Sequence, residues 1–330
     1  MINIREKTGV PKYKQIISSI EEAIVSGQLK KGDQIPSVNN IKNEFKLSRD
    51  TVLMAFNSLK NRGIIKSIVG KGYYISSTNI DVKKRIFLLF DELNSFKEDL
   101  YSSFLQHLDE HVDVDIYFHH FNQELFHKLI MDSVGAYNYY VIMPANLKNT
   151  HLTLENLPHK QIYILDQMHE DLLQYSGIYQ NFRKDIYTGL TNALNLIKKY
   201  NKVVLVFNED KQPKGMLEGF EDFIKKNALK SEVIKSFGSR SVSEGEVYII
   251  PDDKTLIKVI KNIKSSDLTL AKNIGIISYN DTLLKEIVED GITTISTDFA
   301  LMGAQLAKMI LDGTQARIEN KNNLIIRNSI

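Results

Sequence analysis

A short run of polar and basic side chains, Ser48, Arg49, Asp50 and Thr51, opens a helical stretch. Arginine can bind the edge of a guanine through two hydrogen bonds, which makes Arg49 the best candidate for reading a base. Ser48 and Thr51 suit hydrogen bonds to phosphate oxygens, and Ser48 can also cap the helix. Asp50 can accept from a cytosine amine or orient Arg49. This chemistry predicts a surface that contacts DNA.

The second candidate contact is the turn Gly70-Lys71-Gly72. Its two glycines permit positive φ angles, so Lys71 would stand at the tip, within reach of a minor-groove phosphate. Ser37 can cap the helical stretch at residues 38–45, and Asn39, in the first turn of that stretch, can bind a phosphate or an adenine. The predicted DNA-binding residues are therefore Ser37, Asn39, Ser48, Arg49, Asp50, Thr51, Gly70, Lys71, Gly72 and Tyr73.

Two short helices and a hairpin would position these side chains. Apolar residues have the spacing of a buried helical stripe in residues 38–45 and again in residues 52–59. Two β-branched runs flank the Gly-Lys-Gly turn, which is typical of a hairpin. A further helix over residues 11–27, with isoleucines on one face, would support the other two. Residues 1–75 thus predict a winged helix-turn-helix.

The charge distribution indicates a polyanionic partner. The 330 residues include 42 Lys and Arg against 40 Asp and Glu, a net charge of +2. Residues 1–75 hold 13 of the bases and 6 of the acids, or +7, which leaves 29 bases and 34 acids, or −5, in the remainder. Exposed lysines can be merely solvated. We nevertheless expect the basic first segment to meet phosphates.

Residues 10–76 resemble, without a gap, the DNA-binding domain of the GntR family of bacterial transcription regulators. The resemblance rests on Pro-x-Tyr-x-Gln-Ile, Gly-Asp-x-Ile-Pro-Ser, Leu-Ser-Arg-x-Thr-Val and the wing glycines. It implies a double-stranded DNA operator as partner. Asn39 and Leu53 stand where many relatives have arginine, so we expect a different operator sequence rather than loss of binding.

Beyond a polar linker at residues 76–84, apolar strands alternate with amphipathic helices. This alternation predicts a doubly wound parallel α/β sheet, and its extent of about 250 residues predicts two such sheets in series. Ligands of such sheets bind at the carboxyl ends of the strands. We therefore predict a two-lobed effector and dimerisation domain over residues 85–330.

Carboxylates and amides follow four of the predicted strands. They suit the hydroxyls of a sugar, and Phe96, Tyr179 and Phe182 could stack on its apolar face. No glycine-rich phosphate loop follows any strand. A single Asp or Asn in this position is more often a helix cap, so the prediction depends on their convergence at one edge. The predicted ligand-binding residues are Asp91, Asn94, Phe96, Gln180, Asn181, Lys214, Asp252, Asn280 and Asp281.

The segment 274–311, which begins IGIISYNDT, looks like the closing segment of LacI-type sugar-responsive repressors. This resemblance implies a two-lobed fold like that of type I periplasmic binding proteins. It also implies that Asn280, with Asp281 beside it, binds sugar hydroxyls and that Asp252 is a strand-end ligand. Lys214 would replace an arginine of that family. We expect a homodimeric repressor of carbohydrate-utilisation genes whose small-molecule effector is a monosaccharide.

Other functions remain open at this point. A sensor of a non-sugar polar metabolite is the first alternative, and an enzyme fused to a DNA-binding head, with strand-end carboxylates as acid and base, is less favoured. Pairs such as His107 with His111 and His119 with His120 could bind a metal, but we predict no metal and no cofactor. Without cysteine, an apolar leader or a run of about 18 apolar residues, the chain is expected to be cytoplasmic.

Overall fold

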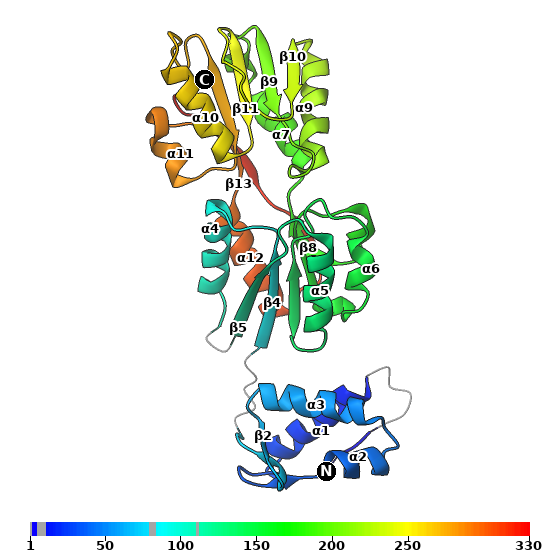
Figure 1. The fold of residues 1–330 in the computed structure, drawn as a ribbon. Coiled ribbons are helices and arrows are strands. Elements are labelled where there is room, and N and C mark those ends of the chain that lie inside the picture. The colour runs from blue at the N-terminus through cyan, green and yellow to red at the C-terminus, as the bar shows by residue number, and fades with distance from the viewer. Residues whose placement is uncertain (1, 5–10, 79–83, 110–111) are drawn as a thin grey trace. The chain divides into compact units, whose positions relative to one another are not determined.

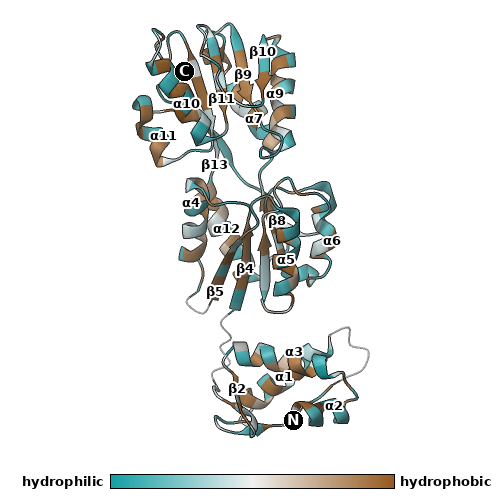
Figure 2. Ribbon diagram, viewed as in Figure 1, coloured by the Kyte–Doolittle hydropathy of each residue, from teal (hydrophilic) through white to brown (hydrophobic). Residues whose placement is uncertain are grey.

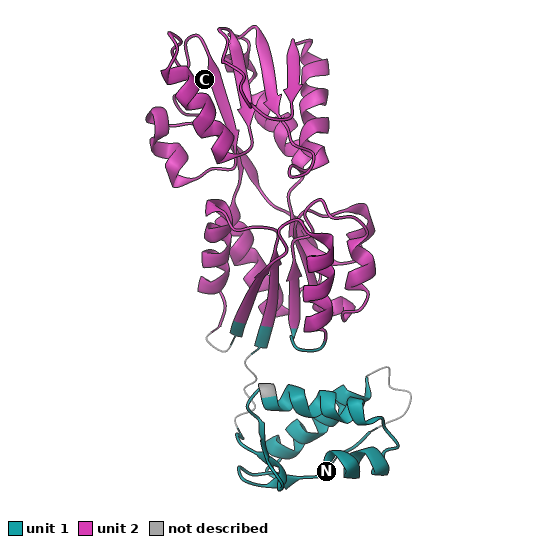
Figure 3. Cartoon of the chain, in the orientation of Figure 1, with its two compact units in different colours: residues 1–85, 110–113, 135–138 teal, residues 86–109, 114–134, 139–330 magenta. Residues whose placement is uncertain are grey.

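The computed structural model describes residues 2–4, 11–78, 84–109 and 112–330. The chain divides into two compact units (Figure 3). The first comprises residues 1–85 with two short stretches, 110–113 and 135–138, and the second comprises the rest. Most of the linker predicted at residues 76–84 falls on residues 79–83, which lie outside the described residues.

The N-terminal unit is built on three helices whose apolar faces meet in one core. Ile16, Ile20 and Phe56 are fully buried there, as their helical spacing predicts. Ser37 and Ser48 each begin a helix by accepting a hydrogen bond from the backbone N–H three residues later. The predicted helices are confirmed as α1 (Lys12–Val25), α2 (Val38–Glu44) and α3 (Arg49–Asn61).

A small antiparallel sheet completes this unit. Its strands are β1 (Gln34–Ile35), β2 (Ile65–Ile68) and β3 (Gly72–Ile75), in the order β1-β3-β2. The turn between β2 and β3 requires φ angles of 74° at Gly70 and 103° at Gly72, which side chains other than hydrogen disfavour. The predicted wing is therefore confirmed.

The second unit contains two mainly parallel sheets with helices on both faces (Figure 1). In the first lobe the strand order is β14-β8-β7-β6-β4-β5. Its inner strands β4, β6 and β7 are nearly continuous apolar runs (Figure 2), as expected for strands that are buried on both faces of a sheet. The elements of the first lobe are β4 (Lys84–Phe90), α4 (Ser95–Gln106), β5 (Val112–Phe118), α5 (Gln123–Ser133), β6 (Tyr139–Ile142), α6 (Thr150–Leu154), β7 (Ile162–Asp166), β8 (Ser176–Tyr179), α12 (Phe299–Asp312) and β14 (Arg317–Glu319).

The second lobe repeats this architecture with the strand order β10-β9-β11-β12-β13-β15. Only the edge strand β15 runs antiparallel to its neighbour among the pairings of the described strands in this sheet. Its elements are α7 (Phe182–Asn192), α8 (Leu194–Ile197), β9 (Lys202–Val206), α9 (Lys214–Asn227), β10 (Ser231–Ile234), β11 (Glu246–Ile250), α10 (Asp253–Lys264), β12 (Gly275–Tyr279), α11 (Leu283–Ile287), β13 (Thr293–Thr297) and β15 (Asn322–Ile325). The predicted α/β fold class with two sheets in series is confirmed.

Each lobe packs one pair of helices through a glycine. A Cβ atom added to Gly303 of α12 would lie 2.3 Å from the carbonyl oxygen of Leu100 in α4. A Cβ atom added to Gly219 of α9 would lie 2.2 Å from the carbonyl oxygen of Arg183 in α7. The two helices of each pair therefore approach so closely that a residue larger than glycine would not fit at Gly303 or Gly219. No helix in the described part of the chain is long and apolar enough to span a membrane.

Three segments of the described chain connect the two lobes, and Asn320 links them. The chain crosses after Tyr179, again at Asp298, and a third time along residues 319–323, which we call the crossover segment. The Asn320 backbone N–H donates to the Tyr179 carbonyl at 2.8 Å, and its side-chain Nδ2 donates to the Asp298 carbonyl at 2.8 Å. Because Asn320 is buried, these bonds tie the three connections into one hinge.

Candidate nucleic-acid interface and effector site

The first turn of α3 presents Arg49 and Asp50 to solvent. Ser48 fixes this turn, since its Oγ accepts the Thr51 backbone N–H at 3.1 Å and lies 2.8 Å from the Thr51 hydroxyl. A helix N-terminus also carries partial positive charge and unpaired N–H groups, both of which favour phosphate. The turn can therefore bind a phosphate while Arg49 reaches outward.

Helix α2 offers a smaller contribution. Asn39 is exposed in its first turn, where its amide can meet a ligand. Ser37 is the N-cap, and its Oγ accepts the Asn40 backbone N–H at 3.2 Å. Leu53, on α3, is half-buried and has no polar group to offer. The structure thus gives Ser37 a capping role in addition to any contact with a partner.

The wing is held rigid at its tip. The Lys71 carbonyl accepts from Gln34 Nε2 at 2.8 Å and from the Tyr74 hydroxyl at 3.2 Å, while the Lys71 side chain is exposed. The Tyr73 ring packs edge-on against Phe56, with 4.6 Å between ring centroids. Tyr73 is therefore partly a core residue, a role that its sequence position did not indicate.

A buried charge cluster lies at the carboxyl ends of the first-lobe strands. Asp91, after β4, forms an ion pair with Lys97 of α4. Asp166, at the end of β7, accepts a hydrogen bond from Gln180 Nε2. Burial raises the pKa of Asp166 to about 6, the charge of Lys97 opposes that shift, and the charge of Asp91 adds to it. One lysine thus compensates two carboxylates.

Two other predicted ligand residues of this lobe have packing roles. The Asn94 side chain caps α4 by accepting the Lys97 backbone N–H at 3.2 Å. The Phe96 ring packs against Phe299, with 4.7 Å between ring centroids. Neither contact prevents an additional ligand contact, but both explain these residues without one.

The histidines do not form a metal site in the described chain. His119 is buried, its Nε2 lies 3.0 Å from the Met143 carbonyl, and burial lowers its pKa. His120 is exposed, and His111 lies outside the described residues. Among the residues that the structure describes, no group of three or more His, Cys, Asp or Glu could hold a metal ion.

In the second lobe, both predicted carboxylates already have partners. Asp252 caps α10, since its Oδ1 accepts the Thr255 backbone N–H at 2.9 Å. Asp281 binds Arg327 through two hydrogen bonds of 2.7 Å each. Burial alone would raise the pKa of Asp281, but the hydrogen bonds from Arg327 and Thr294 lower it below its ordinary value. Arg327 lies near the end of the sequence, where no motif indicated this role.

Two predicted residues keep a free polar atom. The Oε1 of Gln180 and the Oδ1 of Asn280 are buried without a hydrogen-bond partner in the described chain. Asn280 has a positive φ of 61°, and the buried Lys285 holds that backbone by donating to the Tyr279 and Asn280 carbonyls at 2.9 and 2.7 Å. The structure therefore favours these two amides over the carboxylates as hydrogen-bond acceptors for a ligand.

The remaining two predicted residues are engaged at the surface. Asn181 caps α7 through its Oδ1, and its Nδ2 donates to Glu319 at 3.0 Å. Lys214 is 86% exposed and pairs with Glu218 of its own helix at 3.1 Å. Met216 stands where LacI-type repressors have the arginine that Lys214 was expected to replace. It is buried in the core of the second lobe. Of the nine predicted residues, only Gln180 and Asn280 therefore keep a buried side-chain polar atom without a hydrogen-bond partner in the described chain.

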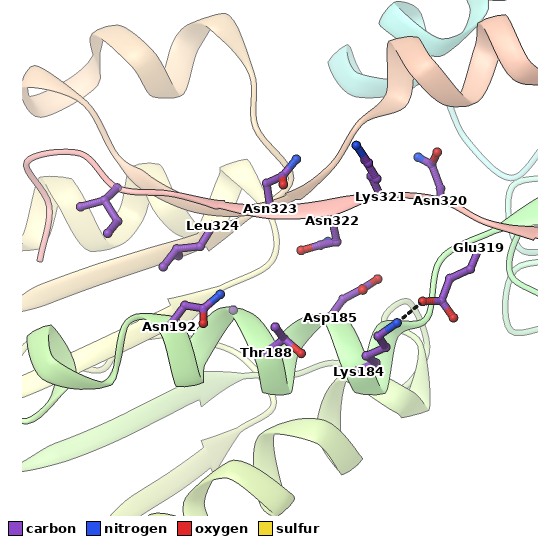
Figure 4. Close-up of a pocket in the computed structure, with 12 residues that line it drawn as sticks. Lys184, Asp185, Thr188, Asn192, Glu319, Asn320, Lys321, Asn322, Asn323 and Leu324 are labelled. Atoms are coloured by element: carbon purple, nitrogen blue, oxygen red, sulfur yellow. Dashed lines mark hydrogen bonds and ion pairs between the residues drawn. The ribbon is translucent and has the colours of Figure 1, made fainter.

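A groove that the sequence did not indicate lies between α7 and the crossover segment (Figure 4). It encloses a cavity of about 580 Å³. Asp185 and Asn322 point into it from opposite sides, and Lys184 forms a 2.6 Å ion pair with Glu319 near its end. The polar run from Glu319 to Asn323 was the available signal, but no repeated pattern placed it beside α7.

Comparison with known sequences identifies the N-terminal region. Residues 12–75 match the family described as bacterial regulatory proteins, gntR family. The mannosyl-D-glycerate transport/metabolism system repressor MngR of Escherichia coli is 36% identical over 107 residues, which is 32% of this chain and 41% of MngR. The arabinose metabolism transcriptional repressor of Geobacillus stearothermophilus is 41% identical over 73 residues, 22% of this chain and 20% of that protein. The chain thus spans less than half of either relative.

Solved structures resemble the remaining three quarters of the chain. A LacI family transcriptional regulator from Silicibacter pomeroyi covers 74% of this chain and 98% of its own, with a TM-score of 0.62 and 15% identity. A LacI family regulator from Lactobacillus casei with bound glucose covers 75% and 100%, with a TM-score of 0.62 and 14% identity. At such identities the likeness concerns the fold alone. The chain therefore carries an N-terminal domain of the GntR family, joined to a two-lobed region with the fold of LacI-type regulators.

Proposed function

We propose that this chain is a DNA-binding transcription regulator that represses carbohydrate-utilisation genes and is controlled by a small sugar bound between the lobes. The observation that carries the proposal is the exposed first turn of α3, with Arg49, in a domain that matches the gntR family. The names of two relatives, repressors of mannosyl-D-glycerate and arabinose systems, support the link to carbohydrates. We assign DNA binding to residues 1–75, the linker to 76–84 and the effector domain to 85–330.

On DNA, α3 enters the major groove with its first turn leading. Arg49 then donates to a guanine edge, while Ser48 and Thr51 meet phosphate oxygens and Asp50 orients Arg49 or accepts from a cytosine. The wing places Lys71 against a minor-groove phosphate. The exposure of Arg49 and Lys71 and the net charge of +7 in residues 1–75 support this assignment.

In the effector domain, the proposed ligand is an uncharged polyol held by strand-end amides. Gln180 and Asn280 each have a buried oxygen free to accept a sugar hydroxyl. The nearby carboxylates Asp91 and Asp281 are already compensated by Lys97 and Arg327. Because Asp91 and Asp281 are already paired, a neutral ligand leaves these ion pairs undisturbed, whereas a charged one would bring an additional desolvation cost.

Control follows from the hinge. A ligand that contacts both lobes favours one arrangement of the three connections that Asn320 ties together. That preference passes through the first lobe to the linker and changes how the DNA-binding domains are presented. The ligand shifts operator affinity only to the extent that it binds the two arrangements differently.

We assign homodimer formation to the apolar side of α11. Leu283 and Ile287 are each 78% exposed, and Leu284 lies beside them. Apolar side chains exposed together mark an interaction surface. A second copy of this chain is the proposed occupant, because a pseudo-palindromic operator requires two winged helices. Leu283→Asp combined with Ile287→Asp should yield monomers in sedimentation velocity; a dimer that persists unchanged would place the interface elsewhere.

The DNA assignment is tested by selecting duplex sites from a random pool with the full chain. Specific binding is expected, with an affinity that falls steeply as salt rises. Binding that is insensitive to salt or to sequence would overturn the assignment. A panel of monosaccharides should then include one that raises the melting temperature of the full chain.

Asn280→Ala tests the sugar site. This variant should lose the sugar-dependent rise in melting temperature and keep the operator affinity of the unliganded protein, because Asn280 is not in the DNA-binding unit. Lys258→Ala, at an exposed position on α10, is the matched control and should respond like the wild type. Unchanged sugar binding in Asn280→Ala would refute the strand-end site.

A further inference from the structure

We propose that the groove between α7 and the crossover segment binds a second small polyhydroxylated ligand. Its lining contains none of the strand-end residues assigned above, so this site is separate from the proposed sugar site. The cavity of about 580 Å³ falls within the range of roughly 300–1,000 Å³ typical of small-molecule sites. A monosaccharide or a sugar alcohol fits this volume.

Two polar atoms in the groove require a partner that both donates and accepts. The Oδ2 of Asp185 is buried without a hydrogen-bond partner among the described residues, although Asp185 is only 6% exposed. The amide Nδ2 of Asn322 has no partner at full hydrogen-bond geometry within the described chain, and it interacts only weakly with the Tyr279 hydroxyl. Figure 4 shows both side chains in the space between α7 and the crossover segment. A hydroxyl that donates to Asp185 and accepts from Asn322 satisfies both.

The rest of the lining favours a neutral ligand. Lys184 is compensated by Glu319 at 2.6 Å, and Figure 4 shows Lys321 directed away from α7. No cation is thus left over in the groove, among the residues described, to attract a phosphate or carboxylate. Thr188 and Asn192 add polar groups along α7, while Leu324 supplies an apolar surface for the carbon atoms of a polyol.

The ionisation of Asp185 gives this site a pH signature. Burial raises the pKa of Asp185 to about 7, the Glu319 charge adds to that shift, and the Lys184 charge opposes it. The charge of Asp185 also acts on Tyr279 of β12, whose pKa is raised first by burial and further by that charge. Because a ligand hydroxyl donates to the ionised carboxylate, affinity should increase about tenfold from pH 6 to pH 8, in step with the ionised fraction.

A ligand in the groove would act on the hinge. Its partner Asn322 and the neighbouring Glu319 belong to the crossover segment, in which Asn320 bonds the other two connections. Filling the groove therefore stabilises the arrangement of the crossover segment beside α7. Such a ligand would modulate the response of the protein to its strand-end ligand by changing the cost of hinge movement.

The test uses the full chain and three probes, D-glucose, D-mannitol and myo-inositol, with binding followed by calorimetry and saturation-transfer NMR. Thr188→Trp fills the groove from an exposed position of α7, and Thr191→Trp places the same ring on that helix outside the lining. For at least one probe, Thr188→Trp should weaken binding more than tenfold, while Thr191→Trp changes it less than twofold.

Asn280→Ala separates this site from the strand-end site. A groove-bound probe keeps its affinity in Asn280→Ala, whereas a probe whose binding is lost only in Asn280→Ala occupies the strand-end site. If no probe depends on Thr188, the groove holds only water and the proposal fails. In Asp185→Asn the rise in affinity from pH 6 to pH 8 should disappear; a rise that persists would exclude Asp185 as the acceptor.

Discussion

The N-terminal domain and the first lobe place their positive charges in opposite environments. Arg49 and Lys71 are exposed at the edge of a small core, whereas Lys97 is only 4% exposed and forms an ion pair with Asp91. An exposed cation can exchange its counterions for a phosphate at little cost. A buried cation cannot leave its carboxylate without leaving an uncompensated charge. The exposed cations are thus suited to an external partner, and the buried lysine to holding the strand ends in place.

The second lobe adds an intermediate case. Asp185 is buried like Asp91, but its Oδ2 has no partner within the described residues. Burial raises the pKa of Asp185, because the nearby Lys184 is paired with Glu319 and offsets the shift only in part, whereas the bidentate partner Arg327 lowers the pKa of Asp281 in the same lobe. Charge pairing, rather than burial alone, therefore separates structural carboxylates from those available to a ligand.

The largest expected effect comes from removing the buried cation of the first lobe. Lys97→Met leaves Asp91 and Asp166 near each other without compensation, which should lower the free energy of unfolding by about 3–5 kcal/mol. Chemical denaturation monitored by circular dichroism measures this change. Lys214→Met removes an exposed cation from a surface pair and should cost less than about 1 kcal/mol. Equal losses in the two variants would contradict the contrast between buried and exposed charges.

The next effect is a pH-dependent gain in stability in Asp185→Asn. The folded-state pKa of about 7 lies above the ordinary aspartate pKa of 3.8, so wild-type stability falls as the pH rises from about 4 to about 7. The variant cannot ionise there and should escape this loss, gaining at most about 4 kcal/mol over the wild type at pH 8 and almost nothing at pH 4.

Urea denaturation of the unliganded proteins at pH 4, 6 and 8 measures that difference. Asp222→Asn, at a half-buried surface carboxylate of α9 that pairs with Arg183, provides a control at which the difference between variant and wild type should not grow with pH. A constant difference for Asp185→Asn between pH 4 and pH 8 would show that its carboxyl group is not ionised at a burial cost.

Much of the fold could be predicted because its periodic elements are long. The isoleucines of α1 and the apolar runs of β4, β9 and β12 have clear spacing, and each lies where the pattern indicates. The short strands β14 and β15 were not predicted. Segments of three or four residues that mix polar and apolar side chains, such as Arg317–Glu319 and Asn322–Ile325, are too short to show a periodicity, and their pairing with β8 and β13 makes them strands.

The candidate sites divide along the same line. The DNA-binding surface depends on residues close in sequence, and Ser48, Arg49 and Lys71 lie where the local pattern indicates. The effector residues depend on which side chains are already engaged, and sequence spacing does not reveal that Arg327 binds Asp281 from 46 positions away. The sequence did not indicate Asp185 for the same reason. Asp185 is a candidate ligand residue because its Oδ2 lacks a hydrogen-bond partner among the described residues, which spacing cannot show.

Arg49→Ala tests the exposed side of the comparison. Loss of one bidentate base contact should weaken operator binding by about 1–3 kcal/mol, roughly 5- to 150-fold, and relax sequence preference at one position. Fluorescence anisotropy with the selected operator and with single-base variants measures both effects. Lys60→Ala, in the last turn of the same helix, is the control and should leave that preference unchanged. A uniform loss across all sequences would make Arg49 a phosphate contact.

The smallest effect is expected at the wing, where a single phosphate contact is at stake. Lys71→Ala should weaken binding to specific and non-specific duplexes alike, because a phosphate contact carries no sequence information. It should also reduce the slope of log affinity against log salt by about 1, which corresponds to one fewer counterion released. Anisotropy titrations at several salt concentrations measure that slope. An unchanged slope would mean that Lys71 stays solvated on DNA, and the exposure of a cation would then not suffice to identify a contact.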